Sequence, residues 1–296
     1  MLVTIRLAVL WFLAGTVSAM AAPCQTCHGD KTQVQSESRH ANTLKRYDGT
    51  GFDGKTLRER GGTLYTYDNT KVAITRDGAR REAIIQWTFG AGRAARSLLL
   101  KQNGQWVEHR ISQYLLLGRL RLTPGHLARP ADSFADAFGL VQSDLDAERC
   151  FACHSTTPNR PGIHCERCHG EGENHPKQPT IRNTKAVALC AECHVYPDRE
   201  YTTAEPEMED PASIRSAPVG LAASKCFQAS KGKLTCITCH DPHTDAKPAV
   251  TYDDECISCH ESGAKKTCPR QSNCANCHMP RSSPIPNLSF TDHRIR

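Results

Sequence analysis

The stretch LTCITCHDPH, residues 234–243, holds two cysteines three positions apart, a histidine directly after the second, and another histidine three residues later. The pattern Cys-x-x-Cys-His recurs seven times along the 296-residue chain and uses fourteen of its sixteen cysteines. Numbered one to seven in chain order, the cysteine pairs are Cys24/Cys27, Cys150/Cys153, Cys165/Cys168, Cys190/Cys193, Cys236/Cys239, Cys256/Cys259 and Cys274/Cys277. The histidines that follow them are His28, His154, His169, His194, His240, His260 and His278. Random placement of residues at this composition would give roughly 0.04 such pentapeptides, so the repeat decides the fold and the chemistry.

Cys-x-x-Cys-His predicts covalent attachment of haem c. The two thiols form thioethers with the two vinyl groups of one haem, and the adjacent histidine becomes the proximal ligand of its iron. Zinc sites also use CxxC pairs, but they combine two motifs per metal and do not require a histidine after each. A thioredoxin-like site needs one CxxC pair in a βαβ setting. The sequence therefore predicts seven covalently bound haem c groups.

Seven histidines lie outside the motifs, and they match the number of irons. We expect four of them to be distal ligands: His40, His175, His243 and His293. Three others are less strongly indicated, with an ordinary surface or hydrogen-bonded histidine as the alternative: His109, His126 and His164. Only two methionines, Met208 and Met279, follow the predicted export signal, so mainly bis-histidine haems are expected.

The position of His243 indicates which iron it binds. It follows His240 by three residues and therefore lies on the same side of the haem that Cys236 and Cys239 hold. It cannot easily pass around that porphyrin to the far face of the same iron. The sequence therefore predicts that His243 binds the iron of a neighbouring haem.

The number of motifs also bounds the interior and the charge. Seven haems leave roughly forty residues for each, far fewer than one domain per cofactor, so the porphyrins must pack together and form much of the core. The formal charge of the polypeptide is +6. Because each ferric haem adds about −1 through its propionates, the basic balance is nearly cancelled and predicts no nucleic-acid partner.

Residues 1–22 are predicted to be a signal peptide, with Arg6 before an apolar run over 7–17 and small residues after it. A retained N-terminal anchor is the alternative. No later segment is apolar for long enough to span a membrane. The mature chain is therefore expected in the periplasm or at the cell surface, without a transmembrane span.

The rest of the chain divides by motif density. Residues 23–45 form the first haem-binding segment, 148–200 and 236–296 each hold three motifs, and 201–235 connect them. Residues 46–147 lack cysteine and contain runs such as AIIQWTF (83–89), which predict a small antiparallel β insert. The expected fold is thus mostly short helices and loops wrapped on stacked haems, with this insert. Cys226 and Cys268 belong to no motif and are predicted to form a disulfide, with free thiols as the alternative.

Several stretches resemble the cytochrome c-554 type of multihaem family with doubled CxxCH motifs. They are SRHA (38–41), FACHST (151–156), GIHCERCHGEGENH (162–175), CFQASKGKLTCITCHDPH (226–243), NCANCHMP (273–280) and FTDHRIR (290–296). TFGAGRAARSLLL (88–100) is similar to the sheet-bearing insert of larger members. The resemblance implies stacked bis-histidine haems, export and electron transfer, and by matching motif it implies His40, His175, His243 and His293 as distal ligands.

Three functions remain open on these grounds. The favoured one is electron transfer between redox partner proteins, a quinol-side donor and a downstream acceptor, because no nucleophile elbow or phosphate loop is present. The second is a multihaem oxidoreductase of nitrite, hydroxylamine or another small molecule, with one five-coordinate haem and His109 or His126 nearby as proton donor. The third is a structural or docking role, in which the sheet recruits a partner or the cytochrome polymerises into a filament.

Overall fold

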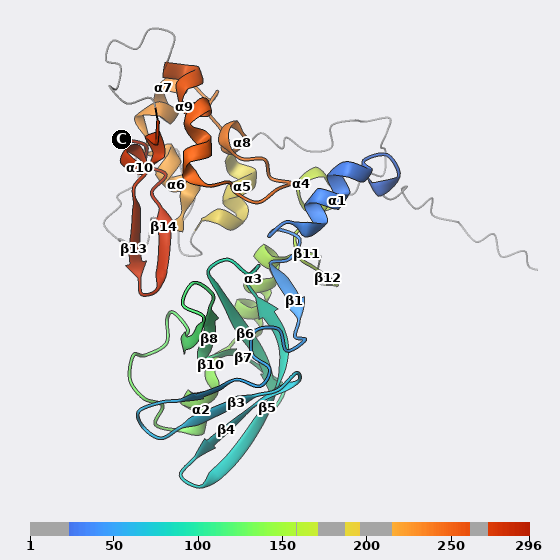
Figure 1. The fold of residues 1–296 in the computed structure, drawn as a ribbon. Coiled ribbons are helices and arrows are strands. Elements are labelled where there is room, and N and C mark those ends of the chain that lie inside the picture. Colours follow the sequence, from blue (N-terminus) through green and yellow to red (C-terminus); the bar gives the residue numbers. More distant parts are fainter. Residues whose placement is uncertain (1–23, 158, 171–186, 196–214, 261–271) are drawn as a thin grey trace, which may run out of the picture.

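A computed structural model describes residues 24–157, 159–170, 187–195, 215–260 and 272–296. Figure 1 shows an antiparallel sheet on one side and, on the other, a group of short helices that carries most of the motifs. Helix α1 (Gly29–Glu37) and strand β1 (Leu44–Arg46) lead from the motif-bearing part onto the sheet. No helix among these residues is long and apolar enough to cross a membrane.

Ten strands form one sheet in the order β10-β7-β6-β5-β4-β3-β2, with β1 paired to β5, β8 to β6 and β9 to β8. Their bounds after β1 are β2 (Thr56–Arg58), β3 (Leu64–Tyr67), β4 (Lys71–Arg76), β5 (Ala79–Phe89), β6 (Ala95–Gln102), β7 (Gln105–His109), β8 (Ile111–Tyr114), β9 (Arg119–Leu122) and β10 (Gly139–Gln142). The mixed helical and sheet character is confirmed, but the prediction of a small insert sheet was wrong. Strand β5 is long enough to pair with β4 over residues 79–84 and with β1 over 87–89, so one edge of it holds two partners.

Two tight turns explain the central hairpins of the sheet. Asp77 and Gly78 have φ of 51° and 76°, and Asn103 and Gly104 have φ of 48° and 81°. Each pair connects strands whose flanking residues are directly opposed. Two consecutive residues with positive φ make the two-residue turn that matches the right-handed twist of a hairpin, and Asp-Gly and Asn-Gly favour it.

The sheet has its own apolar core. The fully buried large side chains in this core are Phe52, Tyr65, Tyr67, Ile74, Leu98, Leu100, Ile111 and Phe138. The last comes from α2 (Phe134–Phe138), where the Ser133 hydroxyl accepts a hydrogen bond from the Asp136 N–H and caps the helix. Arg110 is also buried, and its guanidinium pairs with Glu59 and Asp136.

The motif-bearing part consists of short elements. They are η1 (Cys24–Thr26), α3 (Asp144–His154), α4 (Cys165–His169), α5 (Val187–His194), α6 (Ala217–Ala222), α7 (Lys225–Ser230), α8 (Cys236–Cys239), η3 (Ala249–Tyr252), α9 (Asp253–His260) and α10 (Cys274–His278), with hairpins β11 (Ser155–Thr157)–β12 (Arg160–Pro161) and β13 (Arg281–Ile285)–β14 (Leu288–Thr291). Four of these helices, α4, α7, α8 and α9, contain no buried residue. These four helices therefore contribute no buried side chain, as expected if porphyrins supply much of the interior around them.

Candidate haem-iron sites

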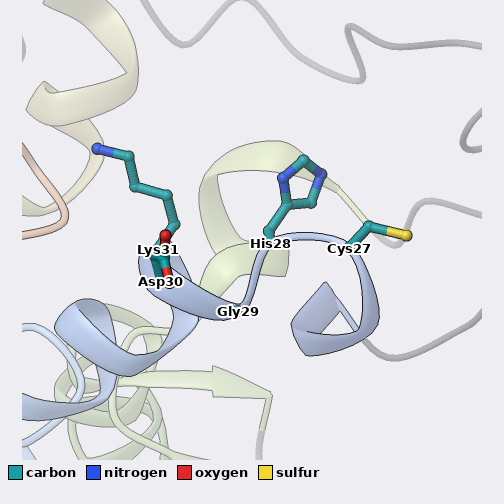
Figure 2. A pocket seen from close by; sticks show the side chains of 5 residues that line it. All are labelled: Cys27, His28, Gly29, Asp30 and Lys31. Atoms are coloured by element: carbon teal, nitrogen blue, oxygen red, sulfur yellow. The ribbon is translucent and has the colours of Figure 1, made fainter.

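Six of the seven motifs lie on α-helical turns that end at or beside the motif histidine, in α3, α4, α5, α8, α9 and α10. Motif one occupies η1 and the turn before α1. Residues three apart on a helical turn face the same side, so the two thiols of each of these six pairs lie on one side of their helix. A pocket opens at motif one, lined by Cys27, His28, Gly29, Asp30 and Lys31. Figure 2 shows the Cys27 thiol and the His28 ring projecting from the turn that joins η1 to α1.

Three motif histidines each face a histidine from outside the motifs. The ring centroids of His194 and His40 lie 6.0 Å apart. The rings of His169 and His243 lie 6.1 Å apart. The rings of His240 and His293 lie 6.3 Å apart. In each pair the partner comes from a segment beside another motif or near the last residues of the chain.

These distances fit a metal between two imidazoles. A metal about 2 Å from each coordinating nitrogen would separate the ring centroids by about 6 Å, and it would leave the angle between the ring planes free. The interplanar angles are 75°, 15° and 43°. The residues therefore fit axial coordination of haem iron.

The hydrogen bonds of the three partner histidines leave the same nitrogen available. Nδ1 of His40 lies 3.1 Å from the Pro242 carbonyl, and Nδ1 of His293 lies 3.0 Å from the Thr291 carbonyl. Nδ1 of His243 lies 2.7 Å from an Asp241 carboxylate oxygen. Because these oxygens only accept, Nδ1 carries the proton and Nε2 keeps the lone pair that a metal needs.

Three motif histidines also have an Nδ1 partner. Thr43 Oγ1 lies 2.7 Å from His154 Nδ1, and the Tyr252 hydroxyl lies 3.2 Å from His240 Nδ1. His278 Nδ1 contacts the Arg296 carbonyl. Nothing in the local sequence marks Thr43 or Tyr252 as such a partner, because the contact depends on folding.

Burial favours the neutral form of the His194 and His169 imidazoles. Burial first, and then the charges of nearby histidines, lowers the pKa of His194 to about 4. Those neighbours are His240 and His154 of motifs five and two, together with His40 and His293 from outside the motifs. Burial, followed by the charges of His243 and His28, lowers the pKa of His169. Neutral imidazole is the form that binds a metal.

Thiols of different motifs also lie against one another. A hydrogen bond from the Cys153 thiol is the main cause that lowers the pKa of Cys193 to about 6, which places motifs two and four side by side. A hydrogen bond with Cys236 likewise lowers the pKa of Cys190 to about 7, so motif five adjoins motif four. Hydrogen bonds also connect Cys24 with Cys165 and Cys256 with Cys274, and an electrostatic interaction joins Cys239 to Cys259. The motifs therefore adjoin in two series, one–three and two–four–five–six–seven.

The motif cysteines differ in exposure. Ten are half-buried, whereas four are exposed: Cys24, Cys27, Cys259 and Cys277. The polypeptide alone does not enclose these four residues. The physical reason is the small size of the elements that carry them, since η1 and α9 bury none of their residues and α10 buries only Ala275. Exposure leaves these four thiols accessible to a vinyl group. The attachment of haem at Cys24, Cys27, Cys259 and Cys277 stays a prediction.

The remaining predicted histidines lie elsewhere. His109 is 0% exposed inside the sheet, where Nδ1 lies 2.7 Å from the Phe138 carbonyl and Nε2 lies 2.8 Å from the Tyr67 hydroxyl. With both nitrogens hydrogen-bonded, it fits the alternative of an ordinary buried histidine and not a distal ligand.

His126 is also buried, with Nε2 3.7 Å from Glu108 Oε2. His164 precedes α4 and its Nε2 lies 2.9 Å from the Pro161 carbonyl. His175 and Cys268, and with it the predicted disulfide to Cys226, lie outside the described residues.

The burial of His109 predicts a pH dependence of stability. Burial lowers its pKa from 6.5 to about 4, so below pH 6.5 the unfolded chain binds a proton that the folded chain does not. The free energy of unfolding should therefore fall by about 2 kcal/mol between pH 7 and pH 5 through this residue. Urea unfolding followed by tryptophan emission should show this loss in the natural protein and not in His109→Gln, whose amide can keep both hydrogen bonds. Parallel pH curves for the two proteins would contradict the prediction.

No family model and no curated protein matches this sequence. A solved structure does match, that of the outer cell wall cytochrome OcwA, with a TM-score of 0.55 and 15% sequence identity over 92% of this chain and 78% of that chain. At this identity the likeness shows the fold alone. It supports a multihaem cytochrome fold in general and not the narrower cytochrome c-554 type.

Proposed function

We propose that this chain is an exported c-type cytochrome that binds seven haem c groups and transfers electrons through them. The observation that carries the proposal is the set of three imidazole pairs at 6.0, 6.1 and 6.3 Å, each joining a motif histidine to a distant one. Haem c, when bound, supplies one-electron transfer at iron, and two histidine ligands favour a low potential. The thiols of the motifs would hold each haem by two thioethers.

The chain's own residues would fix the distances between haems. Each of the three distal histidines links two motifs: His40 follows motif one and faces motif four, whereas His243 follows motif five and faces motif three. His293 follows motif seven and faces motif five. Such links hold neighbouring haems in a defined order, which is what electron transfer between redox partner proteins requires. The similar solved structure is that of a cytochrome of the outer cell wall, which agrees with the proposed export.

A multihaem oxidoreductase with one open haem is the second candidate, and one observation favours it. Seven histidines lie outside the motifs, and the hydrogen bonds of His109 leave six of them for seven irons. At least one iron would then lack a histidine of this chain as sixth ligand. An iron with a vacant sixth coordination position, close to the other motifs, would give a binding site for a small nitrogen or sulfur species.

Pyridine haemochrome analysis with intact mass should give seven haems per mature chain, and fewer would mean that some motifs are not loaded. EPR of the oxidised protein should show low-spin ferric signals for the paired sites, because two imidazoles give a strong ligand field. A high-spin signal, and a reduced spectrum that carbon monoxide shifts, would identify an open iron. Seven low-spin haems that do not react with carbon monoxide would exclude the oxidoreductase.

A further inference from the structure

Motif two is attached to the sheet through a residue that the other motifs do not have. Phe151 lies between Cys150 and Cys153, where the other motifs carry no aromatic residue. Its ring packs against three sheet aromatics, with centroids 5.6 Å from Trp87, 6.0 Å from Phe89 and 5.9 Å from Trp106. The sheet therefore holds helix α3, which carries both cysteines of this motif.

The sheet also contacts the histidine of motif two. The Phe89 ring lies edge-on to the His154 ring, with centroids 5.1 Å apart and planes at 86°. Thr43, directly before β1, places Oγ1 2.7 Å from His154 Nδ1. The Thr43 carbonyl accepts a hydrogen bond of 2.9 Å from the Gly90 N–H, next to Phe89, so the sheet fixes both neighbours of the ring.

Coordination would decide the direction of the Thr43 hydrogen bond. If His154 binds iron through Nε2, Nδ1 must carry the proton and donate a hydrogen bond to Thr43 Oγ1. Donating this hydrogen bond makes the imidazole more basic and stabilises the ferric state of the iron that it binds. The contact also fixes the rotation of the ring, as second-sphere partners of metal-bound histidines do.

We propose that Thr43 is a positioning residue for the motif-two haem, through which the sheet sets the orientation of His154 and lowers the reduction potential of that haem. The inference rests on the proposed function, because it requires haem at motif two. It also gives the ten-stranded sheet a role in electron transfer. Thr43 lies three residues after His40, so one short segment would serve the irons of motifs two and four, whose thiols touch.

The test uses the haem-loaded protein and four single variants: Thr43→Val, Thr43→Ser, Thr88→Val and His154→Met. Thr88 is the matched control, because it is a buried threonine opposite Lys45 in the same strand pair and its hydroxyl has no hydrogen-bond partner. His154→Met identifies the motif-two haem by the EPR signal and midpoint potential that it moves. Potentials are measured by spectroelectrochemical titration.

Thr43→Val should raise the potential of the haem that His154→Met identifies and change its EPR g-values, with the other haems unchanged. Thr43→Ser should keep the natural values, and so should Thr88→Val. Unchanged potentials in Thr43→Val, or equal shifts in Thr43→Val and Thr88→Val, would overturn the inference and leave the proposed function intact. If Thr43→Val does not fold, Thr43→Ala replaces it, and identical behaviour of the Ala and Ser variants would overturn the inference. A natural protein without haem at motif two would instead refute the proposed function.

Discussion

Replacing His243 with alanine should remove the low-spin signal of the motif-three haem, held at Cys165 and Cys168, and leave the motif-five haem at Cys236 and Cys239 unchanged. The reason is geometric. The His243 ring lies 6.1 Å from the motif-three ring and nearly parallel to it, at 15°, although His243 follows motif five in sequence. Without this imidazole the motif-three iron loses its sixth ligand, so one of the seven haems should become high-spin and bind carbon monoxide.

His169→Met gives the assignment in this experiment, because it marks the EPR signal of the motif-three haem. Thr244→Ala is the matched control, since it changes the next residue and the hydroxyl that lies 3.3 Å from the Asp241 carbonyl. It should leave the EPR spectrum of the natural protein unchanged. A change confined to the motif-five haem in His243→Ala would refute both the pairing and the argument that His243 bridges to a neighbour.

Arg110→Met should lower the free energy of unfolding of the sheet by about 3–5 kcal/mol, because it removes a buried guanidinium from the partly buried carboxylates of Glu59 and Asp136. The Arg110 side chain is 1% exposed, with Nε 3.0 Å from Glu59 and Nη1 3.4 Å from Asp136. Its other nitrogen donates to the Leu127 and Arg129 carbonyls, so the guanidinium holds the segment before α2 against the sheet. Denaturant unfolding followed by the emission of Trp87 and Trp106 measures the effect.

Arg129→Met provides the comparison for this variant. Arg129 also pairs with Asp136, at 2.8 Å, but its side chain is 44% exposed. Water can replace an exposed partner, so this change should cost less than about 1 kcal/mol. Equal losses of stability in the two variants would show that burial does not determine the strength of the Arg110 contacts.

The proposed covalent attachment of haem is local, and so the sequence predicts it directly. Two thiols and a histidine within five residues make up one candidate attachment site whatever the rest of the chain does, which is why all seven candidate sites are visible in the printed sequence. Asp77-Gly78 and Asn103-Gly104 are likewise local, because a two-residue turn with positive φ depends on those residues alone. The extent of the sheet was underestimated, since β1 joins it from a segment that precedes the predicted insert.

The pairing of histidines is a tertiary property. The sequence favours His40 and His243 over His109 as distal ligands, but only the fold directs the first two toward particular motif histidines and places the third between Tyr67 and Phe138. The same holds for Thr43, which contacts His154 because β1 pairs with β5. Attachment needs only neighbours along the chain, whereas axial ligation and its hydrogen bonds need groups from distant segments to meet at one point. For that reason the sequence determined how many haems to expect, and only the tertiary structure decided which histidines face each other.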